Sequence, residues 1–193
     1  LLVKLLKSKY LIWIVLSVPF ISICFNYYFQ NIFYGETIHL SGKISVQLLF
    51  LSLFVTPFML TFPDNYLSKW LLSNRRYFGV ASFADALLHT IVYLDRIADK
   101  DRILNDFISL EYLSGWLGLI IFLLLAITSN NYSQRFMGRY WKKLHRFVYL
   151  AVVLIFFHWI LTAFNRTTAT IYLMILCLIE VYRIWMSRKK LLS

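Results

Sequence analysis

The sequence predicts an all-α membrane protein in which six apolar helices cross the bilayer as one bundle. Of the 193 residues, 60% are hydrophobic and 15% are charged, whereas soluble domains average about 45–50% apolar residues. Apolar stretches of about twenty residues recur along the chain, and this is the length that crosses a hydrocarbon core about 30 Å thick. Lys and Arg gather at the ends of these stretches, as is typical of membrane helices.

The first three membrane spans are predicted at about 10–30, 40–62 and 77–94. Turn-forming and polar residues at 31–35 separate the first span from the second, and a Pro-Asp-Asn sequence at 63–65 ends the second. Such residues end helices because they favour turns over continued helical backbone. The first half of the chain therefore predicts two short connections between three helices.

A charged run at 95–106 separates the third span from the second half of the chain. Asn130 and Asn131 end the fourth span, and Asn165 with Arg166 ends the fifth. We expect all six spans to form a single membrane domain over residues 1–193. The last three spans are predicted at about 111–128, 144–164 and 168–187.

The distribution of Lys and Arg predicts the orientation of the bundle. Counted over alternate loops, 15 of the 20 Lys and Arg residues lie on one side, and positive loops face the cytoplasm. Both termini are therefore expected to be cytoplasmic. The net charge of +11 reflects this topology and not nucleic-acid binding, because no basic stripe with interleaved aromatic residues follows a polar face. The 15 residues are Lys4, Lys7, Lys9, Lys69, Arg75, Arg76, Arg135, Arg139, Lys142, Lys143, Arg146, Arg183, Arg188, Lys189 and Lys190.

Three histidines, His89, His145 and His158, lie within or at the edge of the predicted spans. An ionisable ring is costly in hydrocarbon and usually faces a cavity or a cofactor. His89 follows Arg76 by 13 residues and His158 follows Lys143 by 15, which places the rings about 20 Å and about 22 Å from the cytoplasmic edge. Two imidazoles at one level on different helices favour the axial ligation of a six-coordinate b-type haem.

His145 precedes His158 by 13 residues, which is about 20 Å along a helix and would suit a second, stacked haem. The matching positions of the third span are Arg75 and Arg76, so a second bis-histidine haem lacks its partner. Together with Trp141, the two arginines predict a basic, aromatic pocket at the cytoplasmic surface for a flavin phosphate or a haem propionate. Ordinary anchoring at the membrane edge is the alternative explanation of the two arginines.

Four other residues with reactive side chains are less informative. Asp85 precedes His89 by four residues, so it shares the same helical face. It would orient the ring, carry a proton, or face a hydrated vestibule. Cys24 and Cys177 lie in apolar stretches without a CxxCH motif, which excludes a c-type haem attachment site in this sequence. The fourth histidine, His39, falls in a loop-like segment.

Three segments carry motifs of moderate specificity. The segment 75–89 begins Arg-Arg-Tyr-Phe-Gly and ends Leu-His, the segment 125–130 reads Leu-Ala-Ile-Thr-Ser-Asn, and the segment 138–149 follows Gly-x-x-Trp-x-x-Leu-His-x-x-x-Tyr. Together with His158, these motifs resemble the MsrQ (YedZ) family of the ferric reductase-like transmembrane superfamily. The resemblance covers about residues 40–165, which we expect to form the ferric reductase-like core.

The resemblance implies a multi-pass protein of the bacterial inner membrane that binds haem b. It implies electron transfer from a flavin reductase, reduced flavin or quinol to a periplasmic molybdopterin-containing methionine sulfoxide reductase. His89, His145 and His158 map onto the haem-linked histidines of the family, and flavin mononucleotide (FMN) is expected on the inner side. The chain would then be the electron-transfer subunit of a two-component oxidoreductase, with no catalytic domain of its own. Asp85 departs from the pattern, because the family usually has an aromatic residue there.

Two other functions remain open from the sequence. One is a divergent ferric reductase-like cytochrome b that serves another acceptor. The other is a haem-free proton or solute conduit that uses Asp85 and His89. The number of haems is open as well, because the pair His89 and His158 predicts one and His145 would add a second.

Overall fold

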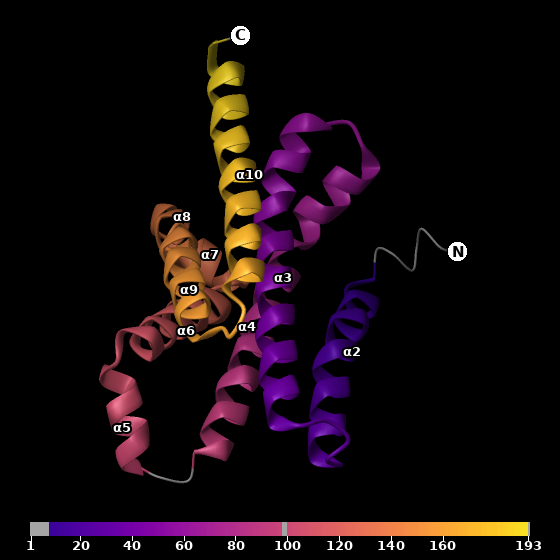
Figure 1. Ribbon diagram of the computed structural model, residues 1–193. Coiled ribbons are helices and arrows are strands. Elements are labelled where there is room, and N and C mark those ends of the chain that lie inside the picture. Colours follow the sequence, from indigo (N-terminus) through magenta and orange to yellow (C-terminus); the bar gives the residue numbers. More distant parts are fainter. Residues whose placement is uncertain (1–7, 98–99, 193) are drawn as a thin grey trace. The chain divides into compact units, whose positions relative to one another are not determined.

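All regular structure in the computed structural model, which describes residues 8–97 and 100–192, is helical. Six of its helices are long and apolar enough to cross a membrane, which confirms the predicted fold class (Figure 1). Lys4 and Lys7, which entered the charge count, lie outside the described residues. The helices are α2 (Lys9–Tyr28), α3 (Tyr34–Thr61), α4 (Tyr66–Arg96), α5 (Lys100–Ile108), α6 (Leu110–Ile127), α7 (Asn131–Met137), α8 (Arg139–His145), α9 (Val148–Thr162) and α10 (Arg166–Leu192).

The chain divides into two compact units. The first comprises Leu1–Ser52 and Asn74–Ala98, and it contains α2, the first part of α3 and most of α4. The second comprises Leu53–Ser73 and Asp99–Ser193, and it contains the remaining parts of α3 and α4 together with α5 to α10. His89 belongs to the first unit and His158 to the second, so each histidine is described within its own unit.

In the first unit, small hydroxyl residues hold α3 against α4. Ser45 Oγ donates to the carbonyl oxygen of Ser82 at 2.8 Å, and Ser82 Oγ donates to the carbonyl oxygen of Ser45 at 2.8 Å. Small residues allow this approach because their side chains add little bulk between the two backbones. Beyond this contact, Ile23, Leu88 and Val92 form a buried apolar cluster. These contacts bury the face of α4 from which His89 projects.

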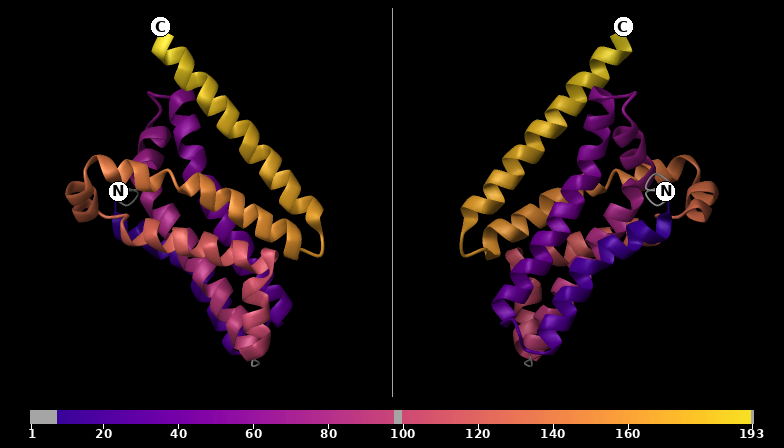
Figure 2. Two further views of the ribbon diagram at one scale, coloured as in Figure 1. Left: turned by 90° about the vertical axis from the view of Figure 1, so that its left-hand side faces the viewer. Right: turned by 90° about the vertical axis from the view of Figure 1, so that its right-hand side faces the viewer.

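In the second unit, α6 packs along α9, as Figure 2 shows. Gly118 lies at this interface, where an added Cβ would be 3.0 Å from Cγ1 of Ile155. The helix α10 packs on α9, and Arg183 of α10 bonds the hydroxyl of Tyr149. Arg183 also forms a 2.8 Å ion pair with Glu180, one turn earlier on α10. The position of His158 is therefore set by its neighbours on α6.

Two helix boundaries differ from the predictions. The helix α4 begins at Tyr66, eleven residues before the predicted start, because an amide hydrogen bond from Leu67 to Asn65 Oδ1 at 2.8 Å begins it early. No Gly or Pro interrupts residues 66–76, so the helix continues among charged residues. Similarly, α3 begins at Tyr34. His39 is therefore an exposed helical residue, and the prediction of a loop at this position is wrong.

The predicted connections at 95–106 and 129–143 contain short helices. The helix α5 occupies part of the first, and α7 and α8 occupy the second. Gly138 separates α7 from α8 with a φ of +51°, a conformation that glycine adopts without steric cost. The fifth predicted span is divided at residues 146–147, where amide groups bond to carbonyls three residues earlier. His145 is consequently the last residue of α8 and precedes the long apolar helix α9.

Candidate functional site

His89 projects from α4 onto a glycine of α3. Its Nδ1 atom lies 2.9 Å from the carbonyl oxygen of Ile38. One turn further along α3, a Cβ added to Gly42 would be 3.0 Å from the same Nδ1 atom. The ring therefore lies directly against the backbone of α3, in space that any larger residue at position 42 would occupy. Gly42 is required for this approach.

His158 of α9 lies against α6 in the same way. Its Nδ1 atom is 2.6 Å from the carbonyl oxygen of Glu111, and a Cβ added to Gly115 would be 2.8 Å from Nδ1. The ring of Tyr112 contacts the imidazole edge to face, with 6.2 Å between centroids. The half-buried ring is thus enclosed by residues of a single turn of α6.

The two histidines share one arrangement, in which a neighbouring helix presents a carbonyl at one position and a glycine four residues later. A carbonyl oxygen only accepts hydrogen bonds, so the proton of a neutral ring is assigned to Nδ1. The lone pair of that ring is then on Nε2. Metal-ligating histidines typically donate their other N–H group to such a carbonyl, which fixes the tautomer and the ring orientation. The predicted role of both histidines as ligands through Nε2 is compatible with this geometry.

Gly42 and Gly115 belong to the candidate site, and the sequence analysis did not identify them. Both lie inside helices, in the N-terminal third of α3 and α6, where glycine costs about 1 kcal/mol relative to alanine. An interior glycine in a long helix is thus a signal in itself, since a packing or functional reason usually accompanies it. Which side chain uses the space could not be read from the sequence, because Ile38 and Glu111 are 51 and 47 residues from their histidine partners.

His145 is held differently from the other two. Its Nδ1 atom is 3.1 Å from the carbonyl oxygen of Trp141 on its own helix, and its ring stacks on the indole with 3.9 Å between centroids. Its Nε2 atom lies 3.4 Å from Ser129 Oγ. A metal bound at Nε2 would replace this contact. His145 is therefore part of a local cluster with Trp141 and Ser129.

Trp141 connects this cluster to the end of α6. Its side chain is 7% exposed, and its indole N–H donates to the carbonyl oxygen of Thr128 at 2.9 Å. Carbonyls at helix ends lack partners within the helix, so this bond satisfies one of them. Arg75 is exposed and Arg76 half-buried on α4 in the other unit. The pocket expected from Arg75, Arg76 and Trp141 stays a prediction.

Asp85 is buried in the first unit, with 1% of its surface exposed. Its Oδ1 atom has no hydrogen-bond partner within the described ranges. The Nδ1 atom of His89 bonds to Ile38, so the structure shows no bond from Asp85 to that atom. The three roles expected for Asp85 from the sequence stay predictions.

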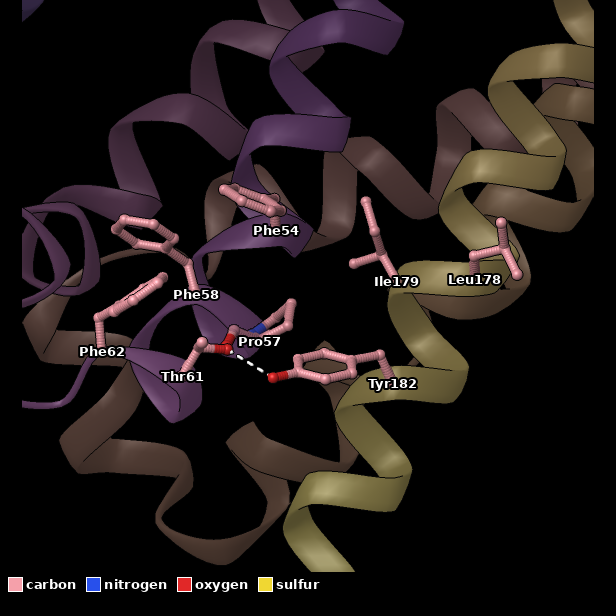
Figure 3. Close-up of a pocket in the computed structure, with 8 residues that line it drawn as sticks. All are labelled: Phe54, Pro57, Phe58, Thr61, Phe62, Leu178, Ile179 and Tyr182. Carbon is pink, nitrogen blue, oxygen red and sulfur yellow. Dashed lines mark hydrogen bonds between the residues drawn. The ribbon is translucent and has the colours of Figure 1, made fainter.

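The second unit also contains an apolar pocket of about 370 Å³ between α3 and α10 (Figure 3). At one end of it, the hydroxyls of Thr61 and Tyr182 are 2.9 Å apart and share a hydrogen bond. Sequence reasoning did not single out these residues, since nothing in the sequence indicates that they meet across 121 positions. The lining consists of Phe54, Pro57, Phe58, Thr61, Phe62, Leu178, Ile179 and Tyr182.

Within the described ranges, no three His, Cys, Asp or Glu side chains gather into a metal site of their own. Cys24 is half-buried and Cys177 is exposed, and neither forms a disulfide. A haem differs from a metal site made of protein groups alone, because the macrocycle supplies four ligands and the protein at most two axial ones. Two separate, oriented imidazoles therefore suit a haem better than a bare metal ion.

Comparison with known proteins gives consistent matches. The model of a family described as ferric reductase like transmembrane component matches residues 41–156. The chain is 35% identical over 137 residues to the protein-methionine-sulfoxide reductase heme-binding subunit MsrQ of Agrobacterium fabrum, covering 69% of this chain and 61% of the relative. It is 35% identical over 117 residues to the protein of the same name from Brucella ovis, covering 59% and 51%. The chain thus spans between half and two thirds of these relatives. No solved structure matches.

Proposed function

Since this chain belongs to the family of ferric reductase like transmembrane components, we propose that it is a haem b electron-transfer subunit of a membrane. The observation that carries the proposal is the shared anchoring of His89 and His158. Each ring is bonded through Nδ1 to a backbone carbonyl of a neighbouring helix, and each is seated on a glycine. Both lie in apolar helices, and counting residues from the basic groups at the cytoplasmic edge predicts a similar depth for the two rings in the bilayer.

The donor set fits a haem. Neutral imidazole is a common axial ligand of haem iron, and in both rings the tautomer places the lone pair on Nε2. The carbonyls of Ile38 and Glu111 hold the rings in orientation, and Gly42 and Gly115 provide the space for them. When bound, the cofactor supplies reversible one-electron chemistry, while the protein supplies the ligands and the apolar surroundings.

The donor and the acceptor are proposed from the relatives. Their name describes a haem-binding subunit of a protein methionine sulfoxide reductase. We infer that the acceptor is a periplasmic molybdopterin-containing methionine sulfoxide reductase. The electrons would come from a cytoplasmic flavin reductase, reduced flavin or a membrane quinol. This direction corresponds to a bacterial inner membrane with both termini in the cytoplasm, as the positive loops predict.

A second cofactor on the inner side is proposed from His145, Arg75, Arg76 and Trp141. The arginines would bind a phosphate of FMN or a propionate of haem through charge-assisted hydrogen bonds. The indole of Trp141 already donates to Thr128, so its contribution would be the stacked surface that it forms with His145. A second haem would use His145 as a ligand and would replace its contact with Ser129.

The spectrum of the purified protein tests the proposal. The reduced protein should show the sharp bands of a six-coordinate, low-spin haem b. Replacing His89 or His158 by alanine should abolish this signal, and His145→Ala should retain it. The matched control is His39→Ala, because His39 is exposed on α3. A colourless protein from haem-replete cells, or full low-spin bands in both His89→Ala and His158→Ala, would contradict the proposal.

A haem-free proton conduit is the second candidate function. The observation that favours it is the buried carboxyl group of Asp85 one turn from His89, whose Oδ1 atom has no hydrogen-bond partner among the described residues. Intramembrane carboxylates of this kind occur in proton pathways. The same spectrum separates the two functions, since a conduit would be colourless and would acidify the interior of vesicles under a proton gradient.

A further inference from the structure

Asp85 lies on the face of α4 that is turned into the interior of the first unit. Ser82, Leu88 and Val92 lie on the same face at helical spacing, and all three are buried. Asp85 itself is 1% exposed, and its Oδ1 atom has no hydrogen-bond partner in the described part of the chain. The carboxyl group of Asp85 is therefore shielded from bulk solvent.

The neighbouring hydroxyls do not compensate for this burial. Ser82 precedes Asp85 by one turn, but its hydroxyl donates to the carbonyl of Ser45, and the hydroxyl of Ser45 donates to the carbonyl of Ser82. One turn beyond Asp85, Leu88 belongs to the apolar cluster with Ile23. An ionised carboxylate in such surroundings is expensive, so a buried carboxyl group that persists there usually has a function.

The titratable and charged groups around Asp85 come from all three helices of the unit. On α2, Cys24 packs against the apolar cluster that contains Leu88. The helix α3 carries Glu36 and His39, which are exposed, and Lys43, which is half-buried. On α4, His89 follows one turn later, at a separation of about 6 Å along the helix axis. Among these groups, His89 is the one that connects Asp85 to the proposed cofactor.

We propose that Asp85 is a proton-binding site coupled to the redox state of a haem ligated by His89. One electron from the donor enters the haem, and one proton from water adds to the carboxylate of Asp85 to give the neutral acid. When the acceptor takes the electron, the acid releases the proton again. The charge inside the apolar unit is then unchanged by reduction, which matters because charges interact strongly at low dielectric constant.

A row of buried hydroxyls on α3 supports this assignment. Thr37, Ser41 and Ser45 follow one another at intervals of four residues, and all are buried. They lead from the N-terminal end of α3 to Ser82, which lies one turn from Asp85. Their hydroxyls donate to the carbonyl oxygens of Phe33, Thr37 and Ser82, so the row places polar atoms in an otherwise apolar interior.

This inference rests on the proposed haem function, and redox titration of the haem-loaded protein at a series of pH values tests it. The midpoint potential of the unmodified protein should fall as pH rises, by up to about 59 mV for each tenfold change in proton activity. Asp85→Asn keeps the shape of the side chain but cannot bind the proton, so its potential should not depend on pH in this range. The control is Asp95→Asn on the same helix, because Asp95 is exposed and accepts a bond from Tyr27 at 2.6 Å. It should keep the slope of the unmodified protein.

Infrared difference spectra provide a readout that does not depend on a potential. Reduction should produce the carbonyl band of a protonated carboxylic acid in the unmodified protein, and Asp85→Asn should lack this band. A pH-independent potential in the unmodified protein would overturn the inference, even if Asp85→Asn did not fold. So would an unchanged slope in haem-loaded Asp85→Asn. An unmodified protein that binds no haem would instead contradict the proposed function.

Discussion

Replacing Gly115 by alanine should displace His158 while leaving its chemistry intact. The added methyl group would start 2.8 Å from Nδ1, 3.0 Å from Cε1 and 3.1 Å from Cγ of His158. Ordinary contacts of a Cβ begin at 3.4 Å, so the ring would have to retreat by about 0.6 Å. It cannot do so without lengthening its 2.6 Å bond to the carbonyl of Glu111.

The cost of Gly115→Ala can be divided into three contributions. Overpacking of a tight interface costs about 1–3 kcal/mol, and weakening the bond to Glu111 costs about 0.5–1.5 kcal/mol. Alanine recovers about 1 kcal/mol of helix propensity. The net cost is thus about 2 kcal/mol, and we expect the strain to displace the ring of His158. Since ligands must be held within about 0.5 Å, we expect haem affinity to fall about 30-fold, the equivalent of about 2 kcal/mol.

The assay measures the haem-to-protein ratio and the low-spin absorption of the purified protein, together with the melting temperature of the apoprotein. Gly118→Ala is the matched control. It adds the same methyl group one turn away in the same interface, but there it meets Cγ1 of Ile155 at 3.0 Å and not the ring of His158. We expect Gly118→Ala to change stability by a similar amount and to retain the haem spectrum.

Full haem content and an unchanged low-spin spectrum in Gly115→Ala would contradict the ligand role of His158. An equal loss of haem in Gly118→Ala would contradict it too, because the loss would then come from general disturbance of the α6 and α9 interface. Only a selective loss at position 115 supports the ligand role of His158.

Two further predictions concern positions 42 and 141. Gly42→Ala should reduce haem content, because the new Cβ would lie 3.0 Å from Nδ1 of His89. The control Gly79→Ala should leave the spectrum unchanged, since the nearest neighbour of its new Cβ is 3.8 Å away. Equal spectra in both variants would contradict this prediction. Trp141→Phe removes the N–H group that bonds Thr128 and should lower the free energy of unfolding by about 1 kcal/mol, measured by thermal denaturation, with full haem content. Loss of haem in Trp141→Phe would point instead to a cofactor at the inner side.

The six membrane helices could be predicted because hydropathy is a local property of the chain. A stretch of about twenty apolar residues must be helical in a bilayer, since the hydrocarbon core offers no other partner for its backbone groups. The helix boundaries were harder to predict. Outside the hydrocarbon the backbone of charged segments still forms helix, so α3 and α4 begin earlier than the apolar stretches do.

The candidate ligands could be predicted as well, because a histidine in an apolar helix is unusual in itself. The hydrogen bonds and packing that orient these side chains could not be predicted. The bond from His89 to Ile38 and the space above Gly42 exist only where α3 packs against α4. The different state of His145, stacked on Trp141 at the end of a short helix, likewise depends on where the backbone of α8 ends.

The class of protein, the number of spans and the three histidines could be predicted from composition and hydropathy, because these act on each segment independently of the others. The surroundings of each histidine ring depend on the tertiary structure. It paired His89 and His158 with carbonyls of neighbouring helices and closed the interior around Asp85. These outcomes depend on which faces of distant helices pack together. Hydrogen bonds between helices and burial form only where helices pack, so a single segment does not predict them.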